Sequence, residues 1–98
     1  MDKKEARRLL EEEMSKYRSR AYGELVRLTR EQDTYEITSP SGNWYQLEFQ
    51  AMMLKPGGSI CVIGSIDDGG IAAFKPESDS FEMGPDNRII RERNVNSE

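Results

Sequence analysis

Apolar side chains recur at intervals of three and four residues near the start of the chain. They are Ala6, Leu9, Leu10, Met14 and Tyr17. This spacing places them on one side of a helix over residues 2–17. The opposite side is charged, and Arg7 precedes Glu11 by four residues, the spacing at which opposite charges pair on a helix surface. The pattern predicts an amphipathic helix with a solvated charged face.

A second, shorter helix is predicted over residues 20–28. Ser19 is suited to cap its start, and Tyr22 and Leu25 supply its apolar side. The two helices, joined around Arg18, would form a helical hairpin. We expect this hairpin to pack on one face of the sheet that follows.

From Asp33 onward the hydrophobic period changes to two, as in strands. A first strand is expected at residues 34–38 and a second at 44–53. The side chains of the second strand that should face the helices are Tyr45, Leu47, Phe49 and Ala51. Residues 59–66 are apolar on both sides, which is typical of a central strand.

The segment Gly64–Gly70 is interpreted as a hairpin turn, and Ile71–Phe74 after it is expected to return as a strand. Short edge pieces are expected at residues 80–84 and 88–91. The tail over residues 94–98 is expected to be frayed.

These elements predict one α+β domain over residues 1–98. Its N-terminal helical hairpin packs on one face of a four- to five-stranded antiparallel meander sheet over residues 33–91. The predicted core contains Leu9, Leu10, Leu25, Ile37, Tyr45, Leu47, Phe49, Ile60, Val62 and Phe74.

Charge is distributed unevenly along the 98 residues. Residues 1–31 carry a net +2 and residues 32–98 carry −6, so the β-half is acidic. This argues against nucleic acid as a partner, because phosphate binding draws on clustered cations. The cations nearest the second helix are Arg18, Arg20, Arg27 and Arg30. They are interleaved with glutamates, which favours a solvated helix face over a nucleic-acid patch.

No apolar run approaches the roughly 18 residues needed to span a membrane. The charged start also lacks the apolar stretch of a signal peptide. We therefore expect a cytoplasmic protein without a membrane partner, present as a monomer or a weak homodimer.

The chain contains no histidine. This removes the usual general base, the usual metal ligand and every Ser-His or Cys-His nucleophile pair. The single cysteine, Cys61, rules out an internal disulfide and is expected to be a buried, inert thiol. We therefore predict no catalytic residue, no metal ligand and no cofactor, and a non-catalytic protein is favoured over an enzyme.

Asp67 and Asp68 leave two interpretations open. As turn residues, they would bond the backbone of a tight hairpin. As chemical groups, they would join Glu48, Asp79 or Glu82 around a small molecule or a divalent metal, since magnesium and calcium take several oxygen ligands. Adjacent residues on a strand point to opposite faces, which favours the turn.

Trp44 lies with Gln46 and Glu48 on the strand face that points away from the helices. It is either packed under the C-terminal segment, which we favour, or exposed as a protein-interaction hot spot. In the exposed case the acidic side chains of Glu48, Asp67 and Glu82 would steer a basic partner.

Several short motifs follow one another in a recognisable order. They are Tyr35-Glu36-Ile37, Ser41-Gly42, Tyr45-Gln46-Leu47-Glu48, Gly64-Ser65-Ile66-Asp67-Asp68-Gly69-Gly70, Ala73-Phe74, Pro76 and Phe81. With these motifs the chain, from Leu9 to Asp86, resembles a family of small, uncharacterised bacterial proteins that have an N-terminal helical segment. The resemblance implies a natural domain and carries no activity, partner or site residue.

Two classes of function are therefore expected. The first is a small non-catalytic module that binds another protein, such as an inhibitor, an immunity-type protein or an accessory regulator. The alternative is a small-molecule or divalent-metal binding protein, or an enzyme, that uses the carboxylates near Asp67 and Asp68.

Overall fold

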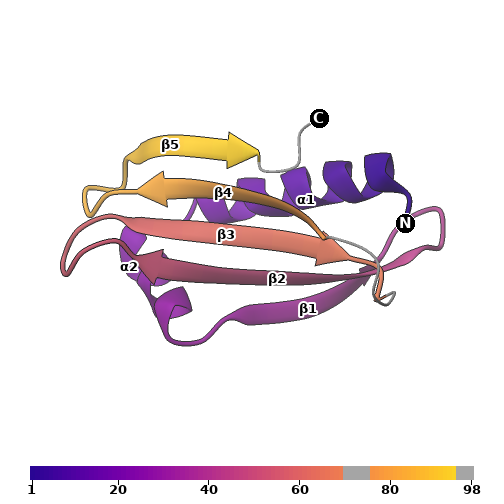
Figure 1. Cartoon of the computed structure of the whole chain (residues 1–98), viewed down its shortest axis with the longest axis horizontal. Helices are drawn as coiled ribbons and strands as arrows, with labels where there is room; N and C mark the ends of the chain where they lie inside the picture. The colour runs from indigo at the N-terminus through magenta and orange to yellow at the C-terminus, as the bar shows by residue number, and fades with distance from the viewer. Residues whose placement is uncertain (70–75, 95–98) are drawn as a thin grey trace.

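Five antiparallel strands form one meander sheet in the order β1-β2-β3-β4-β5. The computed structural model describes residues 1–69 and 76–94. The strands are β1 (Asp33–Thr38), β2 (Trp44–Met53), β3 (Ile60–Asp67), β4 (Glu77–Met83) and β5 (Ile89–Asn94). The described helices lie behind the sheet in Figure 1, on one of its faces. The predicted α+β class and antiparallel meander are confirmed.

Helix α1 (Lys3–Arg18) is the long N-terminal helix that the apolar spacing predicts. It begins after Asp2, whose Oδ1 accepts a hydrogen bond from the backbone N–H of Glu5 at 3.0 Å. Its buried side consists of the five predicted residues, Ala6, Leu9, Leu10, Met14 and Tyr17. The prediction of which side of this helix is buried is therefore confirmed.

The predicted helical hairpin is wrong. Within residues 20–28 the structure has one helical turn, α2 (Tyr22–Leu25), followed by the 3₁₀-helix η1 (Val26–Thr29). Ser19 does not cap this segment but ends α1, where its hydroxyl donates to the carbonyl of Lys16 at 2.8 Å. A single turn cannot balance the entropy of helix formation by itself, so it needs tertiary contacts.

Those contacts come from two turns of the sheet. The side-chain oxygen of Asn87 accepts a hydrogen bond from the Tyr22 N–H at 2.7 Å, in place of a side-chain cap from Ala21. The Tyr22 hydroxyl donates to the carbonyl of Gly58 at 2.6 Å. The α2 segment thus links the β2–β3 turn to the β4–β5 turn at one end of the sheet (Figure 1).

The opposite end is held by Glu5 of α1. Its carboxylate accepts hydrogen bonds from the Asn43 amide at 2.9 Å, the Ser41 hydroxyl at 2.7 Å and the Tyr45 hydroxyl at 2.7 Å. These donors, Asn43 first, lower the pKa of Glu5 to about 2. The β1–β2 turn is therefore tied to the first turn of α1.

The core lies between the helices and the helix-facing side of the sheet. Tyr45, Leu47 and Phe49 of β2 are buried there, as their alternation predicts, and β3 is the central strand. Ile37 is partly buried, and Phe74 lies outside the described residues. The other eight predicted core residues are Leu9, Leu10, Leu25, Tyr45, Leu47, Phe49, Ile60 and Val62, and all are buried.

The predicted turn at Gly64–Gly70 begins too early. Gly64, Ser65 and Ile66 belong to β3, and the described neighbour of β3 on that side is β4, which pairs Glu77 with Ile66. Gly64 is buried beneath α1, where an added Cβ would lie 2.7 Å from Sδ of Met14. A glycine that reads as a turn signal in sequence serves here to let the helix approach the sheet closely.

Two predictions concern residues outside the described ranges. The return strand at 71–74 and the frayed tail from residue 95 onward lie outside the described residues. The predicted edge pieces at 80–84 and 88–91 correspond to β4 and β5, which are longer than expected. Within the described ranges, no helix is long and apolar enough to cross a membrane.

Candidate functional site

The sheet face opposite the helices is not covered by any described element, and we call it the open face. Its side chains alternate along the strands with the buried residues of the helix-facing side. They belong to Thr34, Glu36, Thr38, Trp44, Gln46, Glu48, Gln50, Met52, Cys61, Ile63, Ser65, Asp67, Ser78, Ser80, Glu82, Arg91 and Arg93. The residues from Ile89 to Asn94 extend the sheet edgewise as β5 and do not fold over this face (Figure 1).

Trp44 stands at one end of the open face. It is 38% exposed, and its indole N–H donates to Oε1 of Glu36 on β1 at 3.2 Å. The ring packs against Gly69, where an added Cβ would lie 2.5 Å from Cζ3 of the indole. Trp44 also lines a surface cavity of about 370 Å³ with Asp68, Asn43 and the start of the chain. The structure thus brings together Trp44 and Asp68, two of the predicted site residues.

The predicted carboxylates are spread over the sheet. Asp67 lies opposite Gln46, Glu48 lies opposite Ser65, and Glu82 lies opposite Cys61, so they occupy three separate rows. Glu82 is engaged within the protein by the Ser59 hydroxyl at 2.7 Å and by Arg91 at 3.2 Å. Among the described residues no group of three or more acidic, cysteine or histidine side chains could hold a metal ion.

Asp67 and Asp68 both make local contacts. Oδ1 of Asp67 accepts a hydrogen bond from the N–H of Gly69 at 2.7 Å, the backbone-bonding role that the turn interpretation expects. Gly69 has a positive φ of 78°. Asp68 lies 3.5 Å from the α-amino group of Met1.

Cys61 lies on the open face and is half-buried rather than fully buried. Burial raises the pKa of its thiol, so the thiol is protonated at neutral pH and a poor nucleophile. The position makes it a native reporter of the open face, because it is the single cysteine of the chain.

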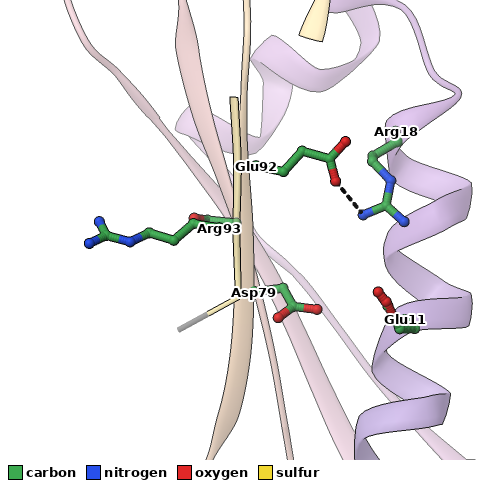
Figure 2. Close-up of a pocket in the computed structure, with 6 residues that line it drawn as sticks. Glu11, Arg18, Asp79, Glu92 and Arg93 are labelled. Carbon is green, nitrogen blue, oxygen red and sulfur yellow. Dashed lines mark ion pairs between the residues drawn. The ribbon is translucent and has the colours of Figure 1, made fainter. Parts of the chain in front are cut away.

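A polar groove of about 200 Å³ runs between α1 and the β4–β5 edge on the other side of the sheet. Figure 2 shows Glu11 and Arg18 of α1 facing Asp79 and Glu92, with an ion pair of 3.7 Å between Arg18 and Glu92. Arg93 points away from the groove, toward the open face.

Sequence reasoning missed the ionic contact next to this groove. Arg7 does not pair with Glu11 as expected but reaches β4, where it contacts Asp79 at 2.6 Å and Glu77 at 3.1 Å. Both carboxylates are buried, with exposed fractions of 5% and 3%. One signal in the sequence was available. Acidic residues alternate in Glu77-Ser78-Asp79, so both carboxylates point to the same side of the strand and indicate that this side faces a cation.

Three of the four arginines considered for nucleic-acid binding are engaged separately. Arg18 pairs with Glu92, Arg20 lies over the Tyr17 ring at 4.3 Å, and Arg27 binds Asp33 at 2.9 Å. They do not form one free basic face.

Exposed apolar side chains occupy two further places at the turn end of the sheet. Met53 is the last residue of β2 and Leu54 follows it, while Ile89 and Ile90 begin β5. The two places are three strand spacings apart, about 14 Å. This follows from the pairing across the sheet, in which Met53 pairs with Ile60, Ile60 with Met83 and Met83 with Ile89. They are therefore two small patches rather than one large apolar surface.

Comparison with family models, with curated proteins and with solved structures found no match for this chain. The resemblance to a family of small bacterial proteins therefore stays a prediction.

Proposed function

We propose that this chain is a non-catalytic module that binds another protein through the open face of its sheet. The observation that carries the proposal is the one-sided packing of the sheet. Helices cover one face, and the described part of the chain places nothing over the other. Inhibitors, immunity-type proteins and accessory regulators act in this manner, by contact rather than by chemistry.

The side chains of the open face support contact. Trp44 is partly exposed at one end, Met52 is exposed at the other end of the same strand, and Ile63 is half-buried in the centre. Aromatic and aliphatic anchors among polar neighbours are the usual composition of protein interfaces. The absence of histidine and the separation of Glu48, Asp67 and Glu82 into different rows give no comparable support to catalysis.

The native thiol of Cys61 allows a direct test. A thiol-reactive benzophenone attached to it at mildly alkaline pH, where more thiolate is present, would be irradiated in an extract of the cells that encode the chain. The expected result is one covalently captured protein. Replacement of Trp44 by alanine should abolish the capture while circular dichroism stays unchanged.

A matched control moves the same probe to the helical side. In the double variant Cys61→Ser/Glu12→Cys, the benzophenone lies on the exposed surface of α1. Capture of the same protein from both positions, or of no protein from Cys61, would contradict an interface on the open face.

A further inference from the structure

We infer that the bound protein presents a basic segment to the half of the open face formed by β1, β2 and β3. This inference rests on the proposed function and adds the chemistry of the partner. The pairing of the strands gathers negative charge on this half of the face.

Three carboxylates stand within about 10 Å of one another on this half, too far apart to hold one metal ion but near enough to share one field. Glu36 and Asp67 are both paired with Gln46, one from each side, so they stand two strand spacings apart, about 10 Å. Glu48 lies two residues further along β2, about 7 Å from the Gln46 row. Glu48 makes no hydrogen bond or ion pair with the described residues.

Trp44 completes the surface. It lies two residues from Gln46 on the same strand, and Glu36 accepts the hydrogen bond from its indole. A cationic side chain over Gln46 would lie within reach of two carboxylates and beside the partly exposed indole of Trp44. Carboxylates and an indole are the groups that attract guanidinium and ammonium ions.

The other half of the face has the opposite character. Glu82 is neutralised by Arg91, and Arg93 adds a further positive charge on β5. A basic segment is therefore attracted to β1–β3 and repelled from β5, which gives the complex a direction as well as affinity.

A second copy of the chain does not supply this charge pattern. Consider a face-to-face dimer whose two-fold axis runs along the strands. Each row of paired residues then faces the same row of the other copy. The carboxylates near Trp44 do not meet the arginines, because the arginines lie in rows toward the other end of the strands. With the axis across the strands, β5 faces β5, and Arg91 and Arg93 face arginines.

The test uses a short peptide of alternating arginine and threonine, with a glutamate–threonine peptide of equal length as its counterpart. Binding to the intact chain is followed by the NMR signal of the Trp44 indole and by calorimetry. The expected result is that the arginine peptide binds at low ionic strength and that the glutamate peptide does not. The double variant Glu36→Gln/Glu48→Gln should bind about fivefold more weakly, since each exposed charge pair contributes a fraction of a kcal/mol.

The control variant Glu12→Gln/Glu31→Gln removes the same net charge from exposed positions off the open face and should bind as the wild type does. Equal weakening of both double variants would overturn the inference, because only net charge would then matter. Calorimetric binding of the arginine peptide that leaves the Trp44 indole signal unmoved would also overturn it, as would a dimer in sedimentation whose formation shifts that signal.

The Cys61 capture separates this inference from the proposed function. A capture yield that falls with Trp44→Ala but is unchanged in Glu36→Gln/Glu48→Gln, measured at a limiting concentration of the chain, leaves the interface in place and refutes the basic partner. A yield that falls in both variants supports both statements.

Discussion

The two faces of the sheet differ in how completely their side chains are satisfied. On the helix-facing side, Phe49 stacks on Tyr17 with ring centroids 4.0 Å apart, and the carboxylates of β4 are bound by Arg7. Within the described ranges, no buried side-chain polar atom lacks a hydrogen-bond partner. On the open face, Glu48, Gln50 and Met52 face away from the protein. The buried core and the buried ion pairs of Arg7 therefore lie on one face, and the proposed partner would contact the other.

The largest effect is expected from Arg7→Leu on the covered side. Removing the guanidinium leaves Glu77 and Asp79 buried without their main cation, which should lower the free energy of unfolding by about 3 kcal/mol. Urea unfolding measures this loss. The control Arg8→Leu removes an exposed arginine that pairs with Glu12 and should cost no more than about 0.5 kcal/mol. Similar losses for both variants would contradict the assigned role of Arg7.

Gly64→Ala should destabilise the protein by about 2 kcal/mol through overpacking. The new Cβ would lie 2.7 Å from Met14 Sδ and 2.9 Å from Cε1 of Phe49. The thioether can move, but the Phe49 ring is held by its stacking on Tyr17. The neighbouring open-face change Ser65→Ala serves as the control and is expected to stay within about 0.5 kcal/mol. A wild-type melting temperature for Gly64→Ala would show that the helix is not seated closely on β3.

Gly69→Ala tests the rim of the open face and should cost about 1 kcal/mol. Its φ of 78° is unfavourable for alanine, and the Cβ would meet the Trp44 ring. We expect a shift in Trp44 fluorescence together with the loss in stability. Gly23→Ala is the matched control, since nothing lies within 4 Å of its Cβ position and its φ is not positive. If the fluorescence of Gly69→Ala equals that of the wild type, Trp44 does not pack on this turn.

The smallest effect concerns Glu5, because solvent screens its interactions. Its pKa is lowered to about 2 in the folded protein, against an ordinary value of 4.5. The carboxylate therefore stabilises the fold above pH 4.5, and this contribution is lost as the pH falls toward 2. Urea midpoints measured across that range should fall less steeply in Glu5→Gln than in the wild type. Parallel curves for the two proteins would mean that Glu5 is not bound to Asn43, Ser41 and Tyr45.

Sequence predicted the side of the sheet on which a candidate residue lies wherever apolar and polar side chains alternate along a strand. Trp44 and Glu48 were placed on the face away from the helices because every second residue of β2 is apolar, and the structure agrees. The favoured prediction that Trp44 packs under the C-terminal segment is wrong for the described residues, because Ile89–Asn94 extends the sheet as β5 and leaves Trp44 38% exposed. The role of Glu82 was equally hidden, since its partner Arg91 comes from the next strand.

The sequence by itself determined the phase of α1, the inward side of β2 and the central position of β3. Each of these follows from side chains a few residues apart, whose common direction is set by the helical or extended backbone. Only the tertiary structure decided the partners of Arg7, the burial of Gly64 and the length of α2. These depend on contacts between residues as far apart as Arg7 and Asp79, which exist only once the chain has folded. The openness of the sheet face was also decided by the tertiary structure. The alternation along a strand shows which side chains point away from the helices, but it does not show whether another segment covers them.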